Sequence, residues 1–281
     1  MTTLSTKNLM IAGGCSFSAD YVSRANEQKP VQWTYDRKTK KHIQWQWEYQ
    51  KPFAIWPEIV AEQNDLQLIN TASPGYGNDA IFHQVIDKIF QYKDSIDLVV
   101  VMWSNWLRKD IEIKDKWMSS TFTADMPSNS KNYWYALHGI GALSENACIN
   151  YFYRYSLALS EICNSFNIKL VMCQGTSFIK SPTKLPEYWN TFGCDEEKSE
   201  REQVKYMKNA IKFFIDHYGF DIIENQNNFI DWPLFSQLGG KTFADIINAN
   251  KNELRLTIQD SHPNGSAHQM YAKKIIDKIN E

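Results

Sequence analysis

Short apolar runs alternate along this chain with longer segments in which apolar residues recur every three or four positions. The short runs are bounded by turn-forming residues and are typical of buried strands, whereas the longer spacing is typical of helices that pack one face on a sheet. This alternation predicts an α/β fold with a mostly parallel central sheet. The expected strands are residues 9–12, 66–69, 98–102, 169–173 and 221–223, and the expected helices are residues 56–62, 79–92, 148–167, 198–218 and 265–279.

Residues 31–49 show a different period, because apolar and mostly aromatic residues occupy every second position on both sides of a charged turn. This spacing predicts a β-hairpin with one aromatic face, inserted after the first strand. Its residues Trp33, Trp45 and Trp47 form either a substrate platform or an accessory hydrophobic core.

Two further segments, residues 103–147 and 174–197, are long excursions between expected strands and helices. Long excursions of a compact domain often serve function. The chain has no linker rich in Gly, Ser or Pro and no internal repeat, so we expect residues 1–281 to form a single domain.

Composition and charge narrow the class of partner. The net charge is −2 with acidic and basic residues interspersed, so the chain offers no long basic face to a nucleic acid. The ten tryptophans and 14 tyrosines suit a carbohydrate or other small-molecule ligand as well as a core. The five cysteines are scattered without paired spacing, and the first residues resemble neither a secretion signal nor a membrane span. We therefore expect reduced thiols, a cytoplasmic protein and no membrane partner.

The candidate chemistry lies in four loops, since ligands of open parallel sheets bind beyond the carboxyl ends of the strands. The loop after the first expected strand reads GGCSFS, and the one after the second reads NTASPGYGN. WSNWLR follows the third strand, and QDSHPNGSAH precedes the last helix. Each motif is common by itself, but their combination in this order is much more specific.

These residues resemble the SGNH (GDSL-type) hydrolase family, whose members carry a serine, a glycine, an asparagine and a histidine in four such blocks. Ser16, Gly75, Asn105 and His262 match those positions, and Arg108 matches the arginine of a subgroup whose third block reads W-S-x-x-x-R. The resemblance implies a three-layer α/β/α, flavodoxin-like fold. It also implies a serine esterase that needs no metal ion or organic cofactor.

The chain departs from the family pattern at several positions. Cys15 replaces an aspartate, Trp103 a glycine and Trp106 a second aspartate, and Asp260 precedes His262 by two residues where the family has three. These departures motivate an alternative from another class, a binding or assembly protein with an impaired site.

A serine nucleophile requires an imidazole that takes its proton and an acceptor that orients the imidazole. Side chains two apart in an extended segment share a side, so Asp260 is expected to hold one ring nitrogen of His262 while the other faces Ser16. Neighbouring residues point in opposite directions, which favours Ser16 over Cys15 as the nucleophile. The expected donors to the oxyanion are the backbone N–H groups of Ser16 and Gly75 and the side chain of Asn105.

The remaining candidates have weaker signals. Asn78 is expected to cap the following helix or to replace Asn105 as a donor, and Arg108 to pair with an acid or to hold a charged or carbonyl-bearing substrate. His268 is expected to form a hydrogen bond near the site, and His83 to lie at the surface or core edge. We expect no metal site, because no carboxylate or thiol lies at ligand spacing from His268.

The sequence thus predicts hydrolysis of a carboxylic ester, with an acyl group on a small molecule or carbohydrate (an acetyl group above all) as the expected substrate. A lipase or thioesterase acting on longer acyl chains is the other enzymatic alternative. The oligomeric state does not follow from the sequence.

Overall fold

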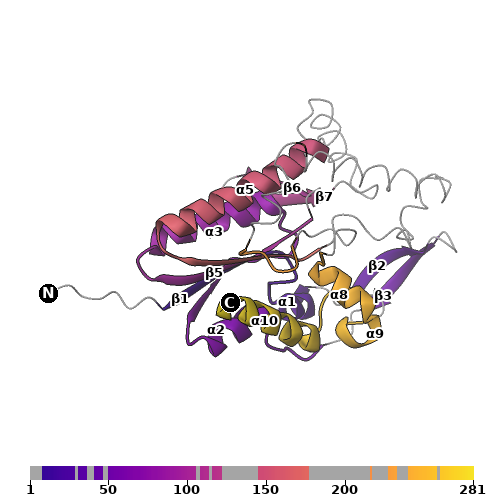
Figure 1. Cartoon of the computed structure of the whole chain (residues 1–281). Helices are drawn as coiled ribbons and strands as arrows, with labels where there is room; N and C mark the ends of the chain where they lie inside the picture. The colour runs from indigo at the N-terminus through magenta and orange to yellow at the C-terminus, as the bar shows by residue number, and fades with distance from the viewer. Residues whose placement is uncertain are drawn as a thin grey trace.

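Four parallel strands form the central sheet of the computed structural model, which describes residues 8–28, 31–36, 41–46, 50–105, 108–113, 116–121, 145–176, 216, 227–232, 240–257 and 260–281 (Figure 1). The strands lie in the order β4 (Gln67–Asn70), β1 (Leu9–Gly13), β5 (Ile96–Trp103) and β8 (Lys169–Gln174). Numbered along the chain, these parallel strands follow the order 2-1-3-4 of a flavodoxin-like sheet. Four of the five expected strands, those at residues 9–12, 66–69, 98–102 and 169–173, are confirmed with slightly different ends.

Beyond β8 the pairing continues at residues 228–230. Met172 N–H donates to the carbonyl of Asn228 at 2.8 Å, and Ile230 N–H donates to the carbonyl of Met172 at 2.8 Å. The resulting bridge between Met172 and Phe229 is parallel. The strand expected at residues 221–223 lies outside the described residues, as does nearly all of the helix expected at residues 198–218.

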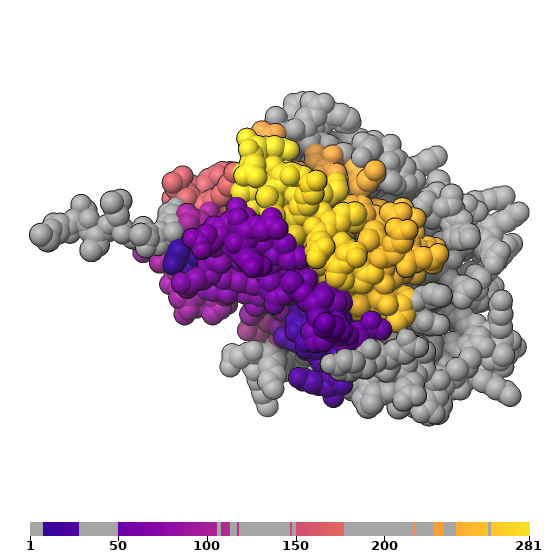
Figure 2. All heavy atoms as spheres, turned by 90° about the horizontal axis from the view of Figure 1, so that it is seen from below, coloured from indigo at the N-terminus to yellow at the C-terminus, as the bar shows by residue number. Residues whose placement is uncertain are grey.

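Helices cover both faces of the sheet, as a three-layer α/β/α fold requires (Figure 1). α3 (Asn78–Tyr92) and α5 (Glu145–Ser165) lie on one face, and α2 (Trp56–Gln63) and α10 (Gly265–Asn280) lie on the other. Figure 2 shows the second face, where α10 lies between α2 and the segment that contains α8 (Phe243–Ala249) and α9 (Lys251–Leu254). The predicted fold class is therefore confirmed.

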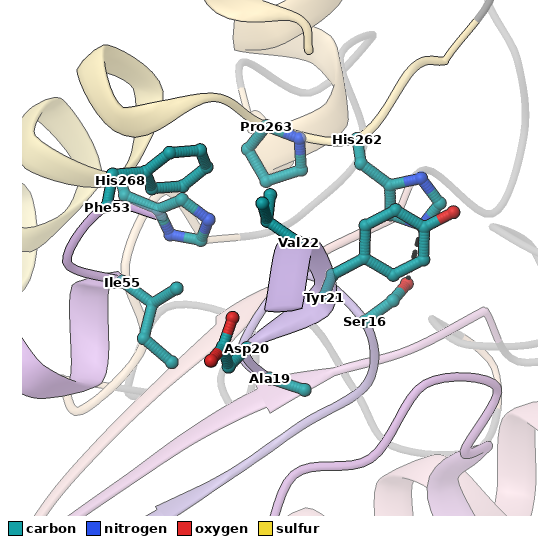
Figure 3. A pocket seen from close by; sticks show the side chains of 10 residues that line it. All are labelled: Ser16, Ala19, Asp20, Tyr21, Val22, Phe53, Ile55, His262, Pro263 and His268. Carbon is teal, nitrogen blue, oxygen red and sulfur yellow. Dashed lines mark hydrogen bonds between the residues drawn. The ribbon is translucent and has the colours of Figure 1, made fainter. Parts of the chain in front are cut away.

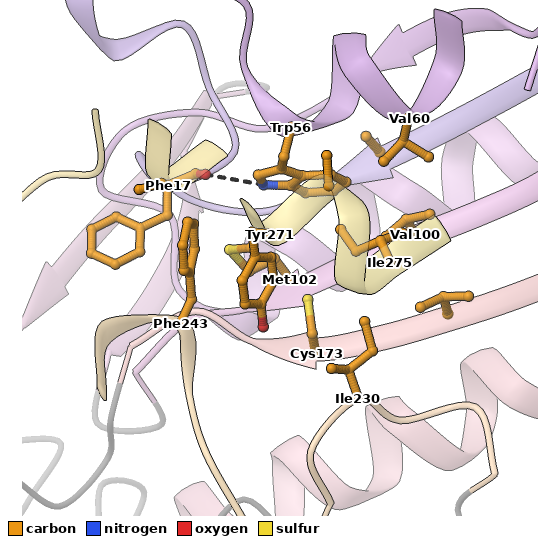
Figure 4. Packing of buried hydrophobic residues seen from close by; sticks show 14 of the residues in the cluster. Phe17, Trp56, Val60, Val100, Met102, Cys173, Ile230, Phe243, Tyr271 and Ile275 are labelled. Carbon is orange, nitrogen blue, oxygen red and sulfur yellow. Dashed lines mark hydrogen bonds between the residues drawn. The ribbon is translucent and has the colours of Figure 1, made fainter. Parts of the chain in front are cut away.

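Strand β5 shows how the apolar pattern fills both cores, because its successive side chains alternate between the two faces. Val99, Val101 and Trp103 belong to the cluster under α3 and α5. Leu98, Val100 and Met102 belong to the cluster under α2 and α10, which Figure 4 shows in part. A strand buried on both sides reads as a continuous apolar run, which is why β5 is the clearest strand in the sequence.

The sequence-based prediction missed several helices and strands. α1 (Tyr21–Gln28), α8 and α9 are helices of eight, seven and four residues, which is too short for a helical period to stand out in the sequence. The excursion at residues 103–147 contains an antiparallel hairpin of β6 (Arg108–Ile113) and β7 (Lys116–Thr121). Among the described residues, no helix has both the length and the apolar character needed to cross a membrane.

The expected hairpin at residues 31–49 is present as β2 (Val31–Asp36) and β3 (Lys41–Gln46), which pair antiparallel. Its register pairs Trp33 with Gln44 and Trp45 with Gln32. Directly opposed positions share a face, so this register assigns positions 33 and 45 to opposite faces, and the prediction of one aromatic face is wrong. Trp47 lies outside the described residues.

Candidate active site

The loop after β1 turns sharply at two glycines. A Cβ atom at Gly13 would lie 2.4 Å from Cγ2 of Val85, and one at Gly14 would lie 2.2 Å from Oγ of Ser18. Larger residues therefore do not fit at either position without displacing these neighbours. The N–H groups of Ser18 and Ala19 both donate to the carbonyl of Cys15, at 2.9 and 3.1 Å, so the chain continues as a tight helical turn.

This turn is fixed from α2, because Trp56 Nε1 donates to the carbonyl of Phe17 at 3.0 Å (Figure 4). Cys15 is fully buried in the core cluster under α2 and α10. Ser16 is 7% exposed and lines a pocket instead. The turn thus directs the Cys15 thiol into the core and the Ser16 hydroxyl toward the ligand side.

Ser16 and His262 line this pocket and face each other (Figure 3), and Asp260 lies on the other side of the His262 ring. Ser16 Oγ is 2.9 Å from Nε2 of His262, and Nδ1 of His262 is 2.5 Å from Oδ1 of Asp260. The three side chains therefore form one continuous chain of hydrogen bonds. Ser16 and His262 are 246 positions apart in sequence, and the fold of the sheet brings them together.

The short spacing between Asp260 and His262 is made possible by a local turn. Oδ1 of Asp260 accepts the backbone N–H of His262 at 2.9 Å as well as its ring nitrogen. The backbone N–H of Asp260 donates to Oγ1 of Thr257 at 2.9 Å, which anchors the start of the turn. An aspartate that bonds the backbone two residues later is a common turn device.

The charge on Asp260 sets the proton arrangement of the pair. Burial by itself would raise the pKa of the Asp260 carboxyl group. The hydrogen bonds and the charge of His262, together with the hydrogen bond from Tyr21, outweigh burial and hold this pKa below its usual value. An ionised Asp260 requires a proton on Nδ1 of His262, which leaves Nε2 free to accept the Ser16 hydroxyl proton. This is the tautomer that a general base needs.

Two aromatic rings next to His262 were not among the sequence-based candidates. The Tyr21 ring stacks on the imidazole with centroids 3.7 Å apart and planes 15° apart. The Phe17 ring meets it edge-on, at 5.6 Å and 73°. Their places just after the serine turn were the one hint in the sequence that these rings lie near the site. α1 is too short and too polar for a periodic pattern to show which way Tyr21 points.

His268 forms the hydrogen bond near the site that its position in the last motif suggests. It is buried, and its Nδ1 accepts the backbone N–H of Trp56 at 3.2 Å. Burial, with a smaller contribution from the charge of His262, lowers the pKa of His268 to about 3. His268 is therefore neutral in the folded protein at any moderate pH. His83 is exposed, as expected, and stacks on Trp117.

The buried His268 makes folding sensitive to acid. Its pKa is about 3 in the folded state and about 6.5 when unfolded, so in this window the unfolded chain binds one more proton. Because of this group, the free energy of unfolding should rise by about 1.4 kcal/mol for each pH unit between these two pKa values. The full contribution is present above about pH 6.5 and is lost toward pH 3.

His268→Asn keeps an acceptor for Trp56 and should flatten this slope in urea titrations at pH 4, 5 and 7. His83→Asn is the matched control, and equal slopes for wild type and His268→Asn would contradict the assignment.

Gly75 lies in the exposed loop after β4. Its φ of +90° is in the region that favours glycine. Apart from Gly75 and its chain neighbours, no atom of the described residues lies within 4 Å of the position of an added Cβ, so these residues leave that side of the backbone open. The roles of the Gly75 N–H and the Asn105 side chain as oxyanion donors stay predictions.

Asn78 does not cap α3, so that expectation is wrong. The cap position is Gly77, which has no side chain, and Oδ1 of Asn78 accepts the backbone N–H of Ser104 at 2.8 Å. The capping acceptor comes from β6 instead. Asp110 accepts the N–H of Gly77 on Oδ1 and that of Ala80 on Oδ2, each at 2.9 Å. Nδ2 of Asn78 is buried and has no hydrogen-bond partner in the described part of the chain, and its alternative role as an oxyanion donor stays a prediction.

Arg108 binds the protein itself. Its NH1 donates to the carbonyl of Tyr76 at 3.1 Å and to Oγ of Ser104 at 3.0 Å. The expected pairing with an acid does not appear among its contacts with described residues. Arg108 thus ties the loop next to Gly75 to the end of β5, which explains the spacing of W-S-x-x-x-R physically. Direct contact of Arg108 with a substrate stays a prediction, as does substrate binding by Trp33, Trp45 and Trp47.

Within the described ranges, no three side chains of His, Cys, Asp or Glu come together as a metal site. Cys15, Cys163 and Cys173, which lie in those ranges, are buried free thiols. Burial raises the pKa values of Cys163 and Cys173 to about 12, so neither supplies a thiolate at neutral pH.

No protein-family model matches this chain, and no curated protein sequence matches it. Three solved structures are similar in outline. A G-D-S-L family protein from Desulfitobacterium hafniense is 11% identical, with 96% of this chain and 99% of that chain covered and a TM-score of 0.45. The esterase EstA from a Pseudoalteromonas species is 15% identical, with 97% of each chain covered and a TM-score of 0.40. The acetylxylan esterase Axe2 from Geobacillus stearothermophilus is 9% identical, with 100% and 97% covered and a TM-score of 0.44. Likeness at this level assigns neither family nor activity, so the function has to be argued from the side chains of this chain.

Proposed function

We propose that this protein is a serine hydrolase that cleaves a carboxylic ester through an acyl-serine intermediate. The observation that carries the proposal is the chain of hydrogen bonds from Ser16 through His262 to Asp260. A serine hydroxyl is a poor nucleophile at neutral pH, and an oriented imidazole at hydrogen-bond distance is what activates it.

In the proposed first half-reaction, Oγ of Ser16 attacks the ester carbonyl carbon while Nε2 of His262 takes the hydroxyl proton. The tetrahedral intermediate then collapses, its bond to the leaving oxygen breaks, and His262 returns the proton to the departing alcohol. In the second half-reaction a water molecule attacks the acyl-serine, again with proton transfer to His262, and the acid leaves. The Asp260 carboxylate stabilises the imidazolium that forms in both halves.

The negative charge on the tetrahedral oxygen requires donors that are already in place. We assign the backbone N–H groups of Ser16 and Gly75 and the amide of Asn105 to this task, each worth about 3 kcal/mol by precedent in other enzymes. The positive φ and the open face of Gly75 support its part, since a substrate oxygen has to approach that backbone closely.

The alternative of an impaired binding protein is motivated by the departures at positions 15, 103 and 106. Cys15 and Trp103 are both fully buried in core clusters, so neither side chain replaces a group that reaches Ser16 from the ligand side. Trp106 lies outside the described residues. Since the Ser16–His262 contact is intact, the enzymatic proposal is favoured.

For the substrate, we propose a short acyl group, an acetyl group above all, on a small molecule or carbohydrate. The resemblance in the four sequence motifs supports this choice. The aromatic hairpin supports it less than its sequence suggests, because the register divides Trp33 and Trp45 between two faces. A lipase or thioesterase for longer chains is the remaining enzymatic alternative.

A fluorophosphonate probe, followed by mass spectrometry of peptides, tests the reaction class. We expect one adduct on the peptide that contains Ser16, and hydrolysis of p-nitrophenyl esters with kcat/KM falling as the acyl chain lengthens from acetate to octanoate. A rise toward octanoate would support the lipase alternative. Absence of both labelling and hydrolysis in folded protein would support the binding protein and reject the proposal.

A further inference from the structure

Tyr21 is placed next to the candidate triad by the same turn that presents Ser16. It is the first residue of α1, and its backbone N–H donates to the carbonyl of Ala19 at 2.8 Å. Asn70 at the end of β4 also fixes this segment, because its Nδ2 donates to the carbonyl of Ser18 at 2.9 Å. These hydrogen bonds hold the backbone that leads from the serine turn into Tyr21.

The side chain of Tyr21 contacts both other members of the triad. Its ring lies flat against the imidazole of His262, as Figure 3 shows. Its hydroxyl donates to Oδ2 of Asp260 at 3.3 Å. Burial, and then the negative charge of Asp260, raise the pKa of Tyr21, so the hydroxyl keeps its proton and remains a donor.

The two oxygens of Asp260 have separate partners. Oδ1 accepts the ring N–H and the backbone N–H of His262, and Oδ2 accepts the hydroxyl of Tyr21. Without the hydroxyl, Oδ2 would have no protein partner in the described residues, and the carboxylate would turn more freely about its terminal bond. The hydroxyl thus fixes the plane of the carboxylate and, through Oδ1, the direction of Nδ1.

The ring contributes separately from the hydroxyl. His262 becomes positively charged when it takes the proton of Ser16, and a cation over an aromatic face is stabilised by the negative potential of the ring. The Phe17 ring meets the same imidazole edge-on. Two rings therefore contact His262, and the one that stacks face to face with it is that of Tyr21.

We propose that Tyr21 is a positioning residue, which holds the Asp260–His262 pair in the orientation that deprotonates Ser16. This role rests on the proposed ester hydrolysis at Ser16. It concerns proton transfer and not substrate binding, so the loss of Tyr21 should lower kcat and leave KM unchanged.

The test compares Tyr21→Phe, which removes the hydroxyl, with Tyr21→Leu, which also removes the ring. With p-nitrophenyl acetate, we expect kcat to fall about tenfold in Tyr21→Phe, as for one hydrogen bond to a charged group. We expect a fall of about a hundredfold in Tyr21→Leu, where the contact with the imidazolium is lost as well. Tyr92→Phe, at the far end of α3, is the matched control and should match wild type.

A second measurement requires no substrate. The proton in the 2.5 Å bond between His262 and Asp260 should give a proton NMR signal far downfield. This signal should shift in Tyr21→Phe, because Asp260 then directs its charge to His262 alone, and it should stay unchanged in Tyr92→Phe. A purely structural role for Tyr21 would lower the melting temperature without this shift.

The two proposals fail in different ways. If wild type hydrolyses esters but Tyr21→Phe keeps both the wild-type kcat and the wild-type NMR signal, the role of Tyr21 is rejected and the hydrolase stands. If wild type neither hydrolyses esters nor reacts with the probe, the hydrolase is rejected, and the NMR comparison alone decides whether Tyr21 positions Asp260.

Discussion

Ser16→Ala should lower kcat/KM for p-nitrophenyl acetate at least about a thousandfold while the protein stays folded. The hydroxyl is the atom that forms the acyl bond, and its removal leaves only binding and oxyanion stabilisation. The side chain is small and makes its hydrogen bond to His262, so little packing is lost. Steady-state kinetics measure the loss of activity, and a thermal melt of the same preparation shows whether the protein is folded.

Cys15→Ala is the matched control, because the neighbouring side chain is fully buried in the core. This variant should lose some stability through a small cavity and keep most of its activity. An active Ser16→Ala together with an inactive, folded Cys15→Ala would reverse the assignment of the nucleophile.

Asp260→Asn should cost up to about ten-thousandfold in turnover, by analogy with other triads. The carboxylate accepts from both the ring and the backbone of His262 on one oxygen and from Tyr21 on the other. An amide has a single acceptor oxygen, and it places no negative charge beside the imidazolium. If its NH2 group turns toward His262, the ring takes the wrong tautomer and Nε2 no longer accepts the Ser16 proton.

Asp260→Ala separates the loss of charge from the change of tautomer, since it offers neither donor nor acceptor. Both variants should fall well below wild type under single-turnover conditions, where chemistry is observed directly. A loss of less than about tenfold in both would mean that a Ser16–His262 dyad suffices and that Asp260 has a structural role.

The features that the sequence predicted best depend on local periodicity. Residues 98–102 read as a buried strand and residues 79–92 as an amphipathic helix, and both are present. The approach of Ser16 to His262 was implied by the resemblance of the four sequence motifs, and the structure brings the two side chains within 2.9 Å.

Other features depend on contacts that no local pattern encodes. The alternation in residues 31–49 predicts two strands but not which residues oppose each other, and the pairing of Asp36 with Lys41 across the turn sets that register. Tyr21 contacts Asp260 across 239 positions, and its short polar helix gives no periodic signal. Asn78 was expected to cap α3 because it lies at the start of that helix. The actual capping acceptor is Asp110, which belongs to a strand that the sequence did not predict.

The cap supplied by Asp110 has a consequence for any shortened version of this protein. The hairpin of β6 and β7 looks dispensable, because it lies apart from the parallel sheet. Deleting it would leave the N–H groups of Gly77 and Ala80 without their carboxylate, and the loss of such a cap typically costs about 1 kcal/mol. The same deletion would release the Tyr76 carbonyl from Arg108, next to Gly75. A minimal version of this protein, designed from the sheet and its helices alone, would thus lose the contacts that hold the loop around Gly75.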